Sequence, residues 1–185
     1  GTIYGGISAP GTLTIKGGLI ECASPTSVVD VPHGSKFIMT GGTIRNTDTE
    51  TADLDDNEKQ PLALDGSSTA VISGGTLESI NGPALRIDGA GAKNGSIEIS
   101  GSAILISQND AAIRTSLWSS KDDIITLMIG DGAKIDGAEG AIDVFEHGDG
   151  ARKNLTIQIN GGAYLKYNGI PYTPNSSVVT YPEGM

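Results

Sequence analysis

The chain has 185 residues and carries 22 acidic against 12 basic side chains, which gives a formal net charge of −10. A chain this acidic is repelled by nucleic acid and by anionic membranes, so both are excluded as partners. The 27 glycines favour many short strands over helices. No apolar run approaches the ~18 residues that a membrane span needs, so no membrane insertion is expected.

A phrase of β-forming residues followed by a glycine pair, or by glycine and another small residue, recurs along the chain. Copies stand at residues 13–18, 37–42 and 70–75. The central apolar residues of the six copies lie 24, 33, 27, 30 and 30 positions apart, and they are Ile15, Met39, Ile72, Ile99, Ile129 and Ile159. A period of this length is typical of stacked repeats, none of which can bury a core alone.

A second apolar phrase follows each glycine pair, so that each repeat is predicted to have three short strands. The copies of this phrase stand at 28–31, 62–65, 84–87, 112–115, 141–144 and, in degraded form, 169–172. The stacked repeats are predicted to form one domain over residues 1–172. Residues 173–185 are predicted to be a C-terminal cap or linker, in which 178–181 are suited to pair with the last repeat.

Alternation along the strands assigns their faces and tests the stacking. The outward column of the second strand is predicted to run Glu21, Arg45, Glu78, Ile106, Asp136, Lys166. The sign of the charge alternates there wherever two charged residues adjoin, as parallel stacking about 4.8 Å apart favours. The outward column of the third strand is predicted to run Asp30, Asp65, Arg86, Arg114, Asp143.

Repeats of 24 to 33 residues with three strands and glycine-marked turns resemble the right-handed parallel β-helix family typified by pectate lyases. The phrases at 72–77 and 81–87 are similar to repeats of large bacterial cell-surface proteins that are described as carbohydrate-binding or adhesive modules. The resemblance covers roughly residues 10–172. It implies an all-β fold, a single right-handed parallel β-helix, as a three-stranded solenoid of about six coils. Its motifs are structural, so it indicates fold more strongly than activity.

Two neighbouring arginines mark a candidate binding surface on the third strand. The guanidinium groups of Arg86 and Arg114 would repel each other unless an anion lies between them. A uronic acid carboxylate could accept hydrogen bonds from both. A ladder of surface salt bridges with Asp143 and the other aspartates is the alternative. Pectate lyases resemble this chain in placing an arginine near Ca²⁺-binding aspartates. No aspartate cluster adjoins the arginines here, and no catalytic residue is assigned.

Trp118 and His147 are the other candidate ligand-binding residues, in two predicted edge loops one repeat apart. An exposed indole offers a flat face on which a sugar ring stacks, while an imidazole binds hydroxyl groups. The alternative is that the Trp118 side chain folds down and closes the edge of the core. Cys22 allows no internal disulfide and is expected to be a small core residue.

A calcium ion is the one cofactor left open, in the insertion between 46 and 61. Asp53, Asp55 and Asn57 copy the first ligands of a calcium loop, because hard cations take several oxygens at alternate positions. Glu58 stands where that loop needs glycine, and Leu64 stands where it needs glutamate. A solvated acidic loop is the competing interpretation.

These features predict a non-catalytic extracellular or cell-surface module, a monomeric part of a larger protein. Its predicted partner is a polysaccharide, including acidic glycans, or a host glycan or glycoprotein. Two alternatives stay open: a small polysaccharide lyase or glycoside hydrolase, and a stalk spacer without a ligand. Enzymatic activity is left undecided, although the separation of His33 from His147 disfavours Ser-His-Asp chemistry.

Overall fold

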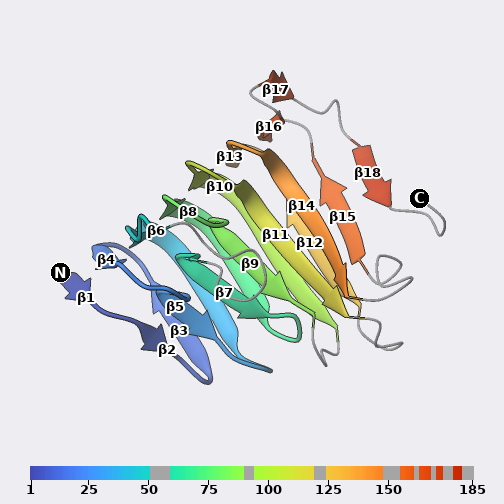
Figure 1. Cartoon of the computed structure of the whole chain (residues 1–185). Helices are drawn as coiled ribbons and strands as arrows, with labels where there is room; N and C mark the ends of the chain where they lie inside the picture. The colour runs from blue at the N-terminus through green and yellow to red at the C-terminus, as the bar shows by residue number, and fades with distance from the viewer. Residues whose placement is uncertain are drawn as a thin grey trace.

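The computed structural model describes residues 1–50, 59–89, 94–118, 124–147, 155–160, 163–167, 170–172 and 177–180. It describes the backbone alone at 117–118, 145–147, 164, 166–167, 170–172 and 177–180. Every regular element within these residues is a β-strand, so this part of the chain holds no helix long enough to cross a membrane. The strands form two sheets, here named sheet A and sheet B (Figure 1).

Sheet A has twelve strands, and sheet B has six. The strands of sheet A are β1 (Thr2–Tyr4), β3 (Thr12–Ile15), β4 (Leu19–Cys22), β6 (Lys36–Asn46), β8 (Thr69–Ser79), β10 (Gly95–Ser107), β12 (Ile125–Ile129), β13 (Lys134–Gly137), β15 (Leu155–Ile159), β16 (Tyr164–Tyr167), β17 (Ile170–Tyr172) and β18 (Ser177–Thr180). Those of sheet B are, in spatial order, β14 (Gly140–His147), β11 (Ala111–Trp118), β9 (Leu85–Asp88), β7 (Leu62–Asp65), β5 (Val29–Val31) and β2 (Ile7–Ser8). All pairs are parallel except β15 with β18 and β16 with β17.

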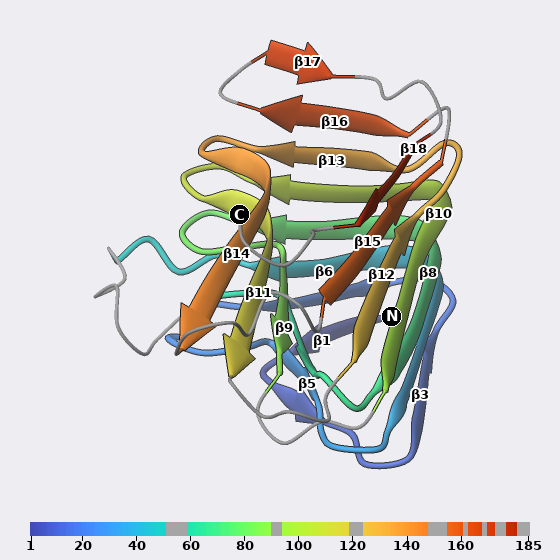
Figure 2. The same cartoon turned by 90° about the vertical axis from the view of Figure 1, so that its right-hand side faces the viewer.

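Three long strands of sheet A bend at glycine corners. Strands β6, β8 and β10 run for 11, 11 and 13 residues, and Figure 2 shows the sheet turning from one limb into another along their length. At Gly75 φ is +94°, and an added Cβ would lie 2.8 Å from the carbonyl oxygen of Gly42. Glycine avoids both the strained backbone and the close contact. The corner therefore bends the strand without ending it.

The prediction of a single right-handed parallel β-helix, a three-stranded solenoid, is wrong. The strands form two parallel sheets in layers, and the two strands predicted on either side of a glycine pair are one continuous strand in β6, β8 and β10. The error comes from interpreting each glycine pair as a break, whereas the backbone passes through it with only a local shift of register. The prediction of an all-β chain is correct.

The register of sheet A follows the predicted columns. Parallel pairing aligns Glu21, Arg45, Glu78, Ile106, Asp136 and Lys166. This confirms the column of alternating charge. The predicted pairing of the C-terminal segment is also confirmed, since β18 lies antiparallel against β15.

In sheet B the predicted column is misaligned at β7, by a shift of two positions. Arg86 pairs with Ala63 and not with Asp65, and Asp30 pairs with the same alanine. Asp65 pairs instead with Asp88. The observed register places Val31 opposite Leu64 in the core, whereas the predicted one would place it opposite Gly66.

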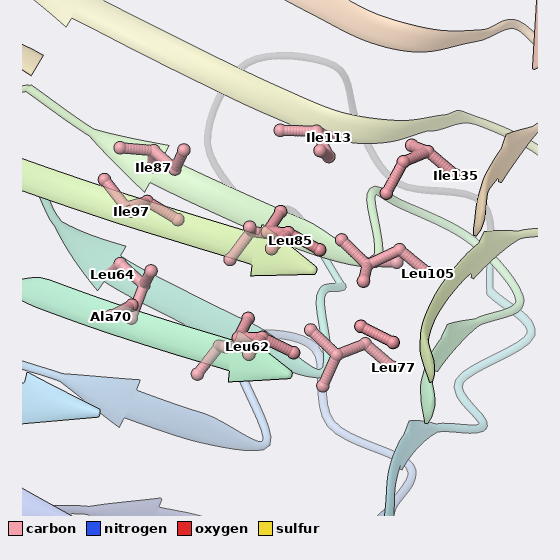
Figure 3. Packing of buried hydrophobic residues seen from close by; sticks show 14 of the residues in the cluster. Leu62, Leu64, Ala70, Leu77, Leu85, Ile87, Ile97, Leu105, Ile113 and Ile135 are labelled. Atoms are coloured by element: carbon pink, nitrogen blue, oxygen red, sulfur yellow. The ribbon is translucent and has the colours of Figure 1, made fainter. Parts of the chain in front are cut away.

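The hydrophobic core lies between the sheets and holds both outer faces in place. Figure 3 shows Leu62, Leu85 and Ile113 of sheet B close to Leu77 and Leu105 of sheet A. These side chains are fully buried. Each contributes about 1.5–3 kcal/mol by leaving water, so the core fixes the register on which the outward residues depend. Cys22, predicted to be a core residue, is partly buried and packs against the core's edge.

Candidate functional site

The five predicted ligand-binding residues come from three adjacent strands of sheet B. Arg86 on β9, Arg114 on β11 and Asp143 on β14 stand side by side in register. Four residues further along the same strands, Trp118 of β11 pairs with His147 of β14. The backbone thus brings all five into one region of the sheet.

Trp118 and His147 lie on paired strands, which corrects their predicted place in edge loops. Strand β11 continues to Trp118 and β14 continues to His147, with seven residues of each strand in register. Residues 113–118 and 142–147 hold several β-branched and aromatic residues, which suits strands better than loops. Both residues therefore occupy fixed positions along the sheet.

The arginines of this region contact carboxylates of the chain itself. Arg114 donates to Oδ1 of Asp110 at 2.5 Å and to Oδ2 of Asp143 at 3.1 Å. Nη2 of Arg86 lies 3.4 Å from Oδ2 of Asp88. The anions that two neighbouring arginines need are therefore present as aspartates. This geometry matches the salt-bridge ladder, which was the alternative to a bound uronic acid.

A groove of about 440 Å³ lies beside Arg86, over strands β5, β7 and β9. Ala63 and Pro32, both partly buried, give it a partly apolar floor. Its charged and amide groups are Asp30, His33, Gln60, Asp65, Arg86 and Asp88. A concave surface that combines an apolar floor with convergent polar groups is the usual form of a binding site for a small polar ligand.

Two aspartates of the groove are held next to each other. Asp65 pairs directly with Asp88, and like charges in such a position destabilise a sheet. Hydrogen bonds offset this for Asp65: Oγ of Ser67 donates to its Oδ1 at 3.0 Å and lies 2.7 Å from Nδ1 of His33. Arg86 acts in the same way on Asp88. The side chains of Asp65 and Asp88 remain 29% and 37% exposed, so both are open to a ligand.

One wall of the groove is fixed by the buried side chain of Asn46. Its Nδ2 donates to the carbonyl oxygens of Ser24 at 2.9 Å and Thr26 at 3.0 Å. Its Oδ1 accepts from the amide of Ser24 at 3.2 Å. Asn46 ends strand β6, so this side chain ties sheet A to the segment that carries Thr26 into the groove. A wall held by three hydrogen bonds does not need a ligand to order it.

The segment that carries Gln60 into the groove rests on a buried ion pair. Lys59 donates from Nζ to Oδ1 of Asp48 at 2.9 Å and to the carbonyl oxygen of Glu50 at 2.7 Å. The hydrogen bond from Lys59 holds the pKa of Asp48 below its ordinary value, although burial of the carboxylate acts in the opposite direction. Gln60 follows directly, and its carbonyl oxygen accepts from the amide of Val28 at 3.1 Å. The backbone of Gln60 is thus held by the ion pair of the preceding residue and by the hydrogen bond from Val28.

The predicted calcium ligands Asp53, Asp55 and Asn57 lie outside the described residues. Among the residues that are described, no group of three or more His, Cys, Asp or Glu side chains could hold a metal ion.

Most of the groove was not identified from the sequence. His33, Gln60 and Asp88 lie at the ends of strands or between them, outside the repeated apolar phrases. The run Asp65-Gly66-Ser67 was a usable signal, because aspartate and serine at a turn hydrogen-bond to nearby groups. In the structure Oδ1 of Asp65 accepts a hydrogen bond from the backbone amide of Ser67 at 3.1 Å.

Chemically, the groove offers carboxylate and amide acceptors next to guanidinium and hydroxyl donors. Groups of both kinds suit a ligand whose hydroxyls donate and accept hydrogen bonds. Comparison with known proteins adds no relative, since no family model, no curated protein and no solved structure matches the chain. A functional assignment must therefore come from the groove and the strands beside it.

Proposed function

We propose that the outer face of sheet B binds a polysaccharide or a protein-linked glycan. In this proposal the chain is a non-catalytic module, monomeric, within an extracellular or cell-surface protein. The observation that carries it is the groove over β5, β7 and β9, with its polar lining and partly apolar floor. Sugar rings present hydroxyl groups to such linings and C–H faces to such floors.

The neighbouring strand supports an extended ligand. Asp88 at the groove pairs with Ser116, which lies two residues before Trp118. Adjacent strands are about 4.8 Å apart, so a chain of sugars that leaves the groove meets β11 within one strand spacing. An aromatic residue there is a stacking platform for a further ring. In this proposal Arg114 and Asp143 hold β11 and β14 together through their salt bridge.

A glycan array with three proteins tests the proposal. Wild type is expected to bind a subset of glycans, and Trp118→Ala is expected to lose most of that binding. Glu98→Gln is the matched control, because Glu98 is exposed on the outer face of sheet A. Binding to no glycan by wild type would instead favour a stalk spacer.

A small polysaccharide lyase or glycoside hydrolase is the second candidate, favoured by the pairing of Asp65 with Asp88. Glycoside hydrolases use two carboxylates that flank the scissile bond. Glycans retained on the array should be incubated with wild type and assayed for new reducing ends and for unsaturated products. Release of either product by wild type but not by Asp65→Asn would replace the binding module by an enzyme.

Calcium binding at Asp53, Asp55 and Asn57 is a separate part of the proposal. Carboxylates at alternate positions are suitable oxygen ligands for this ion. Thermal unfolding in Ca²⁺ and in EDTA tests it, with Asp53→Asn/Asp55→Asn as the variant. A midpoint that is the same in both solutions would remove calcium from the account.

A further inference from the structure

We infer that the groove of sheet B selects an uncharged sugar ring and that Oε1 of Gln60 accepts a hydrogen bond from one of its hydroxyls. The inference rests on the proposed function and adds the class of ligand and the residue that recognises it. Three independent features of the groove support it: an acceptor without a partner, the balance of charge, and the mixture of donors and acceptors.

The first feature is the side chain of Gln60. This residue is 4% exposed and lines the groove. Within the described part of the chain, no donor reaches its Oε1. A buried acceptor without a partner costs more than an ordinary hydrogen bond gains, and such groups are rare in folded proteins. A ligand hydroxyl that donates to Oε1 would remove this cost. The free energy recovered in this way would contribute to binding.

The second feature is charge. Asp30, Asp65 and Asp88 line the groove, against the single guanidinium of Arg86. That guanidinium already contacts Asp88, and the imidazole of His33 lies against Ser67. A carboxylate on the ligand would meet more negative than positive groups and would be repelled. This argues for an uncharged glycan and against the acidic glycans that the two arginines indicated in the sequence.

The third feature separates a sugar from a basic peptide, which the aspartates would also attract. An ammonium group has donors only, so it could not bond to the guanidinium of Arg86, which also has donors only. A sugar hydroxyl donates to a carboxylate or amide oxygen and accepts from a guanidinium or hydroxyl at the same time. The partly apolar floor of Ala63 and Pro32 suits the C–H face of a ring.

The test uses Gln60→Met, which keeps the length of the side chain and removes the acceptor. Probes are uncharged gluco-, manno- and galacto-oligosaccharides, oligogalacturonates of matched length, and a lysine-rich peptide. We expect wild type to prefer an uncharged oligosaccharide, and Gln60→Met to bind it about tenfold more weakly, as the loss of one hydrogen bond predicts. The thermal stability of Gln60→Met without ligand should equal or exceed that of wild type. Glu98→Gln is the control and should bind as wild type does.

Three results would overturn the inference. Equal affinity of Gln60→Met and wild type for an uncharged oligosaccharide would do so while leaving the proposed glycan binding intact. Preference for oligogalacturonate or for the peptide would do so as well. Binding of none of the probes would remove the proposed function together with the inference.

A second measurement covers the case in which Gln60→Met does not fold. The side-chain amide signals of Gln60 can be followed in the ¹H–¹⁵N spectrum of wild type during titration with the uncharged oligosaccharide that binds best. A saturable shift of these signals supports the inference. Signals that stay in place while others shift would overturn it.

Discussion

The outer faces of sheets A and B arrange their charges in opposite ways. On sheet A, Arg45 stands between Glu21 and Glu78 and contacts both, at 3.1 and 2.8 Å. On sheet B, like charges adjoin, because Arg86 pairs with Arg114 and Asp65 with Asp88. The partners that offset them come from other positions on the strands and from turns, such as Asp110 and Ser67.

This difference indicates which face is built for stability alone. Opposite charges placed in register each contribute a few tenths to about 1 kcal/mol to a sheet, whereas like charges cost a similar amount. In sheet A the charges of neighbouring strands stabilise each other directly, whereas in sheet B residues outside the column offset the like charges. Carboxylates kept in an open groove under these conditions are easier to explain by a ligand than by folding.

The largest effect is expected where the chain leaves sheet A and enters sheet B. Lys59→Met would leave the carboxylate of Asp48 buried without its cation, and we expect the free energy of unfolding to fall by about 3 kcal/mol. Urea unfolding measures it. The double variant Lys59→Met/Asp48→Asn should recover part of the loss, since no buried charge then remains. Equal losses in the single and double variants would contradict this.

A smaller loss is expected within sheet B. Arg114 is 15% exposed and donates to two carboxylates. A hydrogen bond to a buried charged group contributes about 1.5–3 kcal/mol, whereas a bridge to an exposed carboxylate contributes well under about 1 kcal/mol. Because Asp143 is 47% exposed, only the bond to Asp110 counts in full, and Arg114→Met should lose about 2 kcal/mol. Asp143→Asn removes the charge of only one partner and should cost less in the same urea experiment. A larger loss for Asp143→Asn than for Arg114→Met would show that the two bridges do not act together.

The pH dependence of stability gives a further comparison. The folded pKa of Asp48 lies below its ordinary value, chiefly because Lys59 donates to it. Its contribution is therefore present above the unfolded pKa, near 3.9, and is lost as the pH falls through the folded value. Wild type should be more stable than Asp48→Asn at neutral pH, by a margin that shrinks as the pH is lowered below about 4. A margin that stays constant into acid would exclude the ion pair as its source.

The sequence predicts the register of sheet A well because burial decides it. Ile15, Met39 and Ile72 recur in the same phrase, and shifting any strand by one residue would expose its apolar set. The column through Arg45 follows directly. The predicted column of sheet B places Asp65 beside Asp30, whereas Asp30 pairs with Ala63. This difference of two residues keeps every side chain on its face, so alternation does not distinguish the two registers.

The repeat pattern of the sequence predicts neither the number of sheets nor the groove. A glycine pair that ends a strand and one that bends it look alike in sequence, so Gly74 and Gly75 could not reveal that β8 is continuous. The groove gathers His33, Gln60 and Asp88 from three segments, and each residue alone is unremarkable. Of the residues that line the groove, the sequence predicts only Arg86 as a ligand-binding residue, because it neighbours Arg114 in the predicted column.

The smallest effect is expected on the outer face of sheet A. The side chain of Arg45 is 38% exposed, and pairs of this kind contribute about 0.2–1 kcal/mol, so Arg45→Met should lose about 0.5 kcal/mol. The hydrogen bond with Glu78 raises the pKa of Arg45, so its contribution is fully present below the unfolded pKa and would fade only in extreme alkali. The loss should therefore not vary between pH 5 and 9, about the range of ordinary buffers, and should shrink in high salt because exposed charges are screened. Urea unfolding at low and high salt measures both effects. A loss as large as that of Arg114→Met would mean that the electrostatic contacts of sheet A are as strong as those of sheet B. The contrast between the two faces would then give no reason to look for a ligand on sheet B.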